Sequence, residues 1–150
     1  MKVIFASDHA GFALKEVLRE YVASLGYEVE DMGAHIYDAN DDYPDLIAPA
    51  ALAVAASNNT KGIILGGSGQ GEAIVANRVP GVRAVVYYGE PAGEHTAHII
   101  PLSREHNDAN ILSLGARFLS EAQAKEAVRL WLSLGFSNDE RHARRIAKVD

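Results

Sequence analysis

The chain has 150 residues, of which 48% are hydrophobic and 23% charged, with a net charge of -6 at pH 7. This length suits one domain with a sizeable core, and we expect a single domain over residues 1–150. The acidic balance argues against nucleic acid as a partner. The absence of cysteine excludes disulfides, a thiolate nucleophile and a cysteine-based zinc site. Without a signal peptide or an apolar run of membrane-spanning length, we expect a cytoplasmic protein with no membrane partner.

The first half of the chain alternates between strand and helix patterns. Residues 2–7 form an apolar run that predicts a strand, and helical spacing predicts a helix over 12–25 that Gly26 ends. Residues 27–32 alternate as in a strand near a sheet edge, and a polar loop spans 34–42. An alanine-rich helix follows over 43–57. Residues 63–65 then predict a short buried strand, which leads through a glycine turn into a helix over 72–77.

The second half continues the alternation. Residues 79–81 predict a turn, and residues 82–87 and 109–115 predict two further strands. Residues 89–102 show no clear hydrophobic periodicity, which predicts an irregular segment. Residues 103–108 would form at most one helical turn. Helices are expected over 119–134, with Ser120 as the N-cap, and over 140–146. Helix-face residues such as Lys15 and Lys125 should be solvated. The pattern predicts an α/β fold with a five-stranded parallel sheet covered on both faces.

The glycine-rich turn at 66–71 is the strongest local signal. A strand that passes through glycines into a helix directs unpaired backbone N–H groups at one point, which suits an anion. The dinucleotide fingerprint and the P-loop motif both fail here, because Glu72 stands where each needs another residue. Two readings stay open: an oxyanion site with a built-in base, or a tight turn with Glu72 favouring the helix dipole.

Polar residues elsewhere are candidates by position. Ligands of parallel sheets collect at the carboxyl ends of the strands, which selects Asp8, His9 and Arg117. Asp8 could equally be a helix N-cap. Arg141 and Arg145 lie four residues apart on one face of the last helix, close to its start, where the dipole disfavours cations. A phosphate group would explain them, and a solvated face is the alternative.

Five separated motifs together resemble the ribose-5-phosphate isomerase B family, which is grouped with the galactose-6-phosphate isomerase subunits. They are Asp8-His9-Ala10-Gly11, Asp42-Tyr43-Pro44, residues 66–72, Arg104-Glu105-His106-Asn107 and Arg141-His142-x-x-Arg145. The resemblance implies a Rossmann-like three-layer α/β/α sandwich and the interconversion of an aldose phosphate and a ketose phosphate. It implies no metal and no organic cofactor, and sites that lie between the two subunits of a dimer.

The resemblance also implies roles for individual residues. Many members of the family carry a cysteine base where this chain has Gly66, and this chain resembles the branch whose base is a glutamate, here Glu72. Ser68 would relay a proton, His106 would open the sugar ring and Asn107 would hydrogen-bond the substrate. The remaining substrate-binding residues would hold the enediolate, the hydroxyls and the phosphate; they are Asp8, His9, Tyr43, Gly67, Gly69, Gln70, Gly71, Arg117, Arg141 and Arg145.

Some alternatives remain open at this point. The substrate pair expected first is ribose 5-phosphate and ribulose 5-phosphate. A six-carbon sugar phosphate as substrate, or a non-catalytic sugar-phosphate-binding module, is also compatible with the sequence. The assembly would be a homodimer or a tetramer. Residues 89–101 look like an insertion relative to the family, and we expect them to form part of the site's rim or a subunit contact, with Ile99 and Ile100 buried. A metal held by His95, His98 and nearby glutamates is the weaker reading of this segment.

Overall fold

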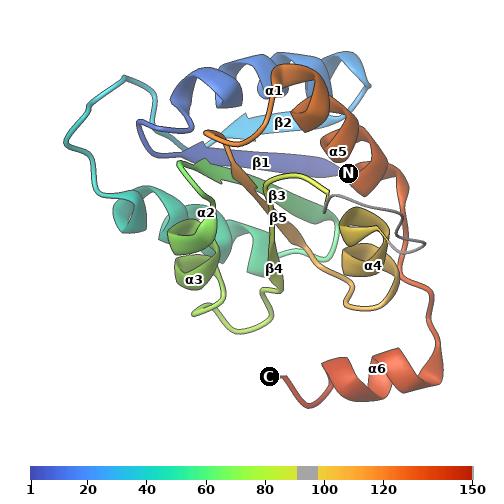
Figure 1. The fold of residues 1–150 in the computed structure, drawn as a ribbon. Helices are drawn as coiled ribbons and strands as arrows, with labels where there is room; N and C mark the ends of the chain where they lie inside the picture. Colours follow the sequence, from blue (N-terminus) through green and yellow to red (C-terminus); the bar gives the residue numbers. More distant parts are fainter. Residues whose placement is uncertain (91–97, 150) are drawn as a thin grey trace.

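The computed structural model describes residues 1–90 and 98–149, which form one five-stranded parallel sheet in the order β2-β1-β3-β5-β4 (Figure 1). The predicted α/β fold and parallel sheet are therefore confirmed. The strands are β1 (Lys2–Ser7), β2 (Glu28–Asp31), β3 (Thr60–Gly66), β4 (Ala84–Tyr87) and β5 (Ile111–Gly115).

Helices cover both faces of this sheet. They are α1 (Phe12–Ser24), α2 (Tyr43–Ala55), α3 (Gln70–Ala76), α4 (Ile99–Glu105), α5 (Glu121–Ser133) and α6 (Glu140–Ile146). The α1, α4 and α5 helices pack on one face, and α2 and α3 pack on the other. The α6 helix projects from the body at the end of an extended segment (Figure 1). In the described part of the chain, no helix has the length and apolar character needed to cross a membrane.

Alternate residues of the central strands supply the two cores. Phe5 in β1 faces Trp131 of α5, and both side chains are fully buried. Ile4 and Ile64 face the other layer, where they pack with Ile47 of α2. A strand whose neighbouring residues are buried on opposite faces reads as a continuous apolar run, which is why β1 and β3 stand out in the sequence. The loops that follow these strands consequently rest on a rigid base.

The α4 helix corrects the prediction that residues 89–102 are irregular. It begins at Ile99 and includes Pro101 in its first turn. Backbone N–H groups in the first turn of a helix have no partner within the helix, so a proline there loses no hydrogen bond. Ile100 is buried in the core beneath it, as expected, and Ile99 is partly buried against the same cluster. Residues 91–97 of the predicted insertion lie outside the described residues.

Lys15 corrects a second prediction, because it is buried rather than solvated. Its Nζ lies 2.7 Å from both carboxylate oxygens of Asp31 and donates to the Ala34 carbonyl at 2.8 Å. Burial alone would raise the pKa of Asp31, but the hydrogen bonds from Lys15 and the Gly33 amide hold it below its ordinary value. This cluster ties α1 to the segment after β2, which leads into the loop that carries Tyr43 to the site.

Replacing Lys15 by Met should lower the free energy of unfolding by about 3 kcal/mol at neutral pH, because a buried carboxylate then loses its main partner. The loss should shrink as the pH falls and Asp31 becomes protonated. A carboxyl group whose pKa is lower in the folded chain than in the unfolded chain contributes its full stabilisation above the unfolded pKa and loses it as the pH falls through the folded pKa. Lys125→Met is the matched control. Its exposed pair with Glu121 should contribute less than about 0.5 kcal/mol. Equal effects of both variants in urea unfolding would contradict the assignment.

Candidate functional site

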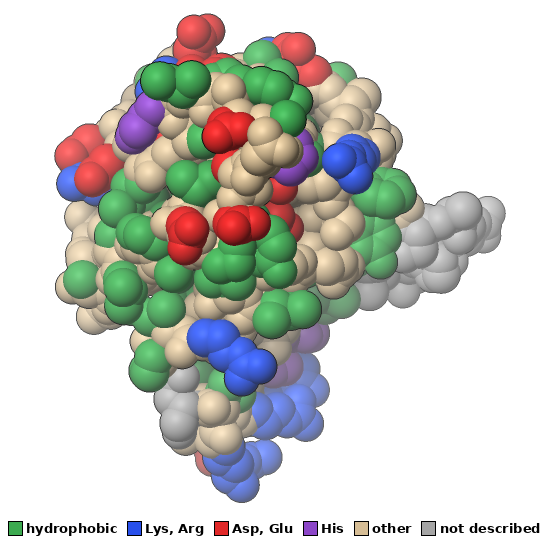
Figure 2. Space-filling view, turned by 90° about the vertical axis from the view of Figure 1, so that its left-hand side faces the viewer, with side chains coloured by type: hydrophobic (Ala, Val, Ile, Leu, Met, Phe, Trp, Pro, Cys, Tyr) green, Lys and Arg blue, Asp and Glu red, His purple; other side chains and the backbone are tan. Residues whose placement is uncertain are grey.

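A pocket of about 330 Å³ opens at the carboxyl ends of the strands. Figure 2 shows this face, where acidic and histidine side chains lie among hydrophobic ones and lysine and arginine side chains lie on the projecting part below. Four segments meet in the pocket: the loops after β1, β3 and β5, and the start of α2. They bring together most of the predicted core of the site: Asp8, Ala10, Tyr43, Gly67, Ser68, Gly71, Glu72, Arg117 and Phe118.

Glu72 lies in the first turn of α3 with only 4% of its surface exposed. Its carboxylate fills the space beside Gly66, so closely that a β-carbon on Gly66 would overlap it. Burial raises the pKa of Glu72, and the nearby charge of Asp8 raises it further, while a hydrogen bond from its own backbone amide lowers it. A buried carboxylate with a raised pKa is a stronger base than an exposed one.

The glycine loop is held from below by β5. Gly69 adopts the left-handed conformation with φ +76°, and its carbonyl accepts a hydrogen bond from the Ser113 hydroxyl at 2.6 Å. Gly71 lies against the ring of Tyr43, where a β-carbon would come within 2.8 Å of the ring. The Gln70 amide already donates to the Ser68 hydroxyl at 3.3 Å. The remaining amides of the loop are the ones available to an anion.

Asp8 combines the two roles that the sequence left open. Its Oδ1 accepts hydrogen bonds from the amides of Ala10 and Gly11 at 2.9 and 3.0 Å, so it organises the start of α1 as a cap would. Among the described residues no hydrogen bond reaches its Oδ2. The carboxylate is buried and lines the pocket, so this second oxygen is free to accept from a ligand hydroxyl.

Two predicted cations lie on the same side of the sheet as the pocket. The guanidinium of Arg117 packs on Gly67, where a β-carbon would approach its Cζ to 3.2 Å. The charge of Arg117 acts on the His9 ring, whose Nδ1 lies 2.6 Å from Oδ1 of Asp41. The His9 Nδ1, Asp8 and Asp41 oxygens cluster within 4.8 Å. Nδ1 and Oδ1 are at hydrogen-bond distance from each other, which indicates a hydrogen bond between them rather than two ligands of one metal ion.

The other predicted residues gather at the opposite edge of the sheet. His106 and Asn107 follow α4 and precede β5, so they lie at the amino ends of the strands. Arg83 secures this turn by donating to the Asn107 carbonyl at 3.0 Å. The ring of His106 stacks on that of His142 in α6, with centroids 4.1 Å apart and planes 14° apart. Arg141 and Arg145 extend from the same helix into solvent.

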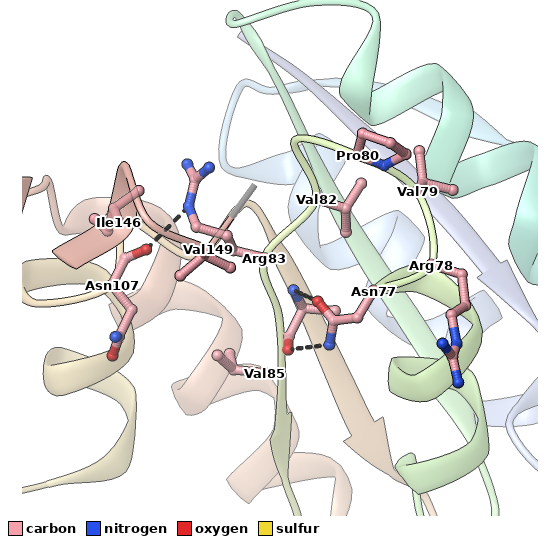
Figure 3. A pocket seen from close by; sticks show the side chains of 11 residues that line it. Asn77, Arg78, Val79, Pro80, Val82, Arg83, Val85, Asn107, Ile146 and Val149 are labelled. Atoms are coloured by element: carbon pink, nitrogen blue, oxygen red, sulfur yellow. Dashed lines mark hydrogen bonds between the residues drawn. The ribbon is translucent and has the colours of Figure 1, made fainter.

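A groove of about 730 Å³ separates α6 from the segment between α3 and β4. Ile146 and Val149 line one side of it, and Val79, Pro80 and Val82 line the other (Figure 3). Asn107 lies at the same groove. The predicted site residues therefore form two groups on one chain: a pocket group at the carboxyl ends of the strands and an α6 group at their amino ends. The length of a strand, at roughly 3.3 Å per residue, separates the two groups.

Some predicted residues lie outside the pocket, and some lining residues were not predicted. Gly69 is buried under β5, and Gln70 faces a separate hollow with Ile74 and Arg78. Sequence reasoning missed Phe118, which follows Arg117 in the chain, and Asp41, which is one of several acidic residues in a polar loop. His142 belongs to the Arg141-His142-x-x-Arg145 motif without a predicted role. Its burial and its stacking on His106 appear only in the folded chain.

The histidine-rich part of the predicted insertion gives no metal site among the residues described. Glu90 accepts from the Ile99 amide at 3.3 Å and lies 3.9 Å from His98 Nδ1, so it caps the start of α4. Glu94 and His95, the other proposed ligands, lie outside the described residues.

Comparisons with known proteins agree with this geometry. The family model described as Ribose/Galactose Isomerase matches residues 3–149. The ribose-5-phosphate isomerase B of Mycobacterium tuberculosis is 39% identical over 146 residues, which cover 97% of this chain and 86% of that protein.

Solved structures show the same fold. Ribose-5-phosphate isomerase B from Clostridium thermocellum superposes with a TM-score of 0.89 at 40% identity, covering 99% of this chain and 95% of that one. The Mycoplasma genitalium enzyme, solved with bound ribulose 5-phosphate, gives a TM-score of 0.89 at 35% identity, covering 99% and 93%. Together with the match over almost the whole chain, these likenesses establish that the chain belongs to the ribose/galactose isomerase family.

Proposed function

We propose that this protein interconverts ribose 5-phosphate and ribulose 5-phosphate, with Glu72 as the base. The observation that carries the proposal is the buried Glu72 carboxylate in the space left by Gly66, beside the glycine loop. The family match and the relatives' activity support the substrate pair. A panel of pentose and hexose phosphates tests it: the proposal expects the highest kcat/KM for ribose 5-phosphate.

The reaction moves one proton between neighbouring carbons. Glu72 removes the proton from C2 of the open-chain aldose, and the C2–H electron pair forms the enediolate while the C1 carbonyl oxygen becomes negative. Free amides of the loop from Gly67 to Gly71 stabilise that oxygen, since they are fixed in place before the charge develops. Ser68 passes a proton between the two oxygens. Protonated Glu72 then returns its proton to C1, which yields the ketose.

The rest of the pocket group orients the sugar. Asp8 accepts from the hydroxyl groups through Oδ2, and Tyr43 lines the wall of the pocket. Arg117 and His9 provide positive charge for the phosphate at the neighbouring edge. Because all of these residues are attached to strand ends of one rigid sheet, they need little rearrangement to bind.

A second copy of the chain completes the site in this proposal. His106 as ring opener, Asn107 as hydrogen-bond donor, and Arg141 and Arg145 as phosphate ligands lie at the wrong edge of the sheet to reach the pocket of their own chain. Exposed apolar side chains support a contact between copies: Ile74 is 61% exposed, and Tyr88 and Phe118, whose rings lie 5.9 Å apart, are 52% and 62% exposed. The groove beside α6 adds further apolar surface.

Replacing Glu72 by Gln preserves the shape of the side chain and removes its basicity. We expect kcat to fall by a factor on the order of 10²–10⁴ with little change in KM. Glu20→Gln on the exposed face of α1 is the matched control and should leave kcat unaltered. In the parent protein, kcat should fall with decreasing pH through a pKa above that of an ordinary glutamate, because the base must be deprotonated. Near-normal kcat in Glu72→Gln would exclude the role.

Replacing Gly66 by Ala should lower kcat by displacing the Glu72 carboxylate, because the added β-carbon occupies its place. Gly135→Ala is the control, since a β-carbon there meets no other atom within 4 Å. In a Glu72→Gln background the Gly66 change should lower kcat little further, as expected for two residues that act as one unit. Fully additive losses would show that Gly66 acts independently of Glu72.

Replacing Arg141 or Arg145 by Ala should raise KM for the sugar phosphate by the equivalent of about 1.5–3 kcal/mol, the contribution of a hydrogen bond between charged groups. Arg144→Ala on the same helix is the control and should leave KM nearly unaltered. Steady-state kinetics of the three variants decide the matter. Equal KM values for all of them would remove α6 from the phosphate site.

Mixing Glu72→Gln protein with His106→Ala protein should restore activity, although each variant alone is inactive. Every mixed dimer would hold one site with an intact Glu72 and an intact His106. Subunit exchange is verified by mass spectrometry or by differently tagged chains. If verified exchange restores nothing, both residues act within one chain.

A further inference from the structure

Asp41 holds His9, which adjoins the pocket residue Asp8, through two contacts. Its Oδ1 lies 2.6 Å from the His9 Nδ1 and also accepts from the His9 backbone amide at 3.2 Å. The two residues are 32 positions apart, and Asp41 lies in the loop between β2 and α2. A single carboxylate oxygen therefore fixes both the backbone and the ring of His9.

Stability of the fold does not account for Asp41. Only 12% of its side chain is exposed, and its Oδ2 is buried without a hydrogen-bond partner among the described residues. A buried carboxylate oxygen that lacks a partner is unfavourable, and an apolar side chain of similar size would avoid the penalty. The contact with His9 is the feature that an apolar side chain could not supply.

The groups that face His9 favour its charged form. The hydrogen bond to Asp41 raises the pKa of His9, and the charges of Asp8 and Asp41 raise it further; partial burial and the Arg117 charge act in the opposite direction. The Tyr37 ring lies at right angles to the imidazole, with the centroids 6.4 Å apart. With Nδ1 engaged by Asp41, Nε2 is the polar ring atom left for a ligand.

The protonation state of Nε2 decides whether this ring attracts or repels an anion. A neutral His9 whose Nδ1–H points at Asp41 would present a lone pair at Nε2, which repels phosphate oxygens. The imidazolium presents Nε2–H and a positive charge instead. A phosphate monoester is mostly dianionic above about pH 6, so it is best bound by a histidine that remains charged there.

We propose that Asp41 is a positioning residue that keeps His9 doubly protonated, with its Nε2–H directed at the phosphate group of the substrate. The inference rests on the proposed function, because it needs a phosphorylated ligand in this pocket. It predicts that phosphate affinity declines as the pH rises through the titration of His9, and that Asp41 sets where this decline occurs.

The test compares Asp41→Asn with the parent protein by NMR titration of the His9 ring, assigned with His9→Gln. His9 should titrate at lower pH in Asp41→Asn and near its parental value in Asp41→Glu. At about pH 8, KM for ribose 5-phosphate should rise about tenfold in Asp41→Asn with kcat within about twofold of the parent, and the difference should shrink towards about pH 6. Asp45→Asn, an exposed neighbour in α2, should change neither quantity.

Several results would overturn the proposal. An unaltered His9 titration in Asp41→Asn would do so, as would a rise in KM that is the same at every pH, which is the mark of a purely structural role. Inorganic phosphate added to the parent protein must shift the His9 resonances, and this readout does not depend on turnover. If the protein does not isomerise ribose 5-phosphate, the proposed function fails while the phosphate titration still decides the role of Asp41. If Asp41→Asn does not fold, the titration of His9 in the parent protein decides instead. A pKa of His9 no higher than that of a histidine in an unfolded peptide would overturn the proposal.

Discussion

The packing of the Glu72 carboxylate into the space beside Gly66 is the constraint on which the site depends. Each residue restricts the other, because the Glu72 carboxylate occupies the volume that a β-carbon at position 66 would need. This arrangement buries a carboxylate, which raises its pKa, and it places the charge next to the amides of the glycine loop. In the proposed mechanism, the same contact sets the position of the base, its basicity and its distance from the developing oxyanion.

The topology of the sheet imposes the second constraint. In a parallel sheet, residues that follow a strand and residues that precede one lie at opposite edges. Glu72, Asp8 and Arg117 belong to the first kind, whereas His106 and Asn107 belong to the second. Bending one chain cannot unite them without breaking the core between the layers, so a proposal that uses both groups requires a second copy. The projecting α6 and the groove beside it (Figures 1 and 3) suit such an arrangement.

Much of this could be predicted from the sequence, because the buried strands and amphipathic helices carry strong periodic signals. The five strands, the Ser120 cap of α5 and the glycine turn that contains Glu72 follow from local patterns. The rest depends on contacts between distant segments. Lys15 looks like a surface residue until Asp31 is folded against it. Asp41 becomes significant only when its loop meets His9, 32 residues away. Pro101 suggested irregular chain, although the first turn of a helix accepts it.

The central claim is proton transfer through an enediolate with Glu72 as the base, and isomerisation in deuterated water tests it most directly. While Glu72 holds the abstracted proton, that proton can exchange with solvent. The account therefore predicts that solvent deuterium enters C1 of the ribulose 5-phosphate formed and C2 of the ribose 5-phosphate recovered, and that Glu72→Gln slows both exchanges along with kcat. NMR of the sugar phosphates reports each position separately. Complete conversion with no deuterium at either carbon, at a rate that Glu72→Gln leaves unaltered, would contradict the account, because hydrogen would then move between the carbons without the Glu72 base.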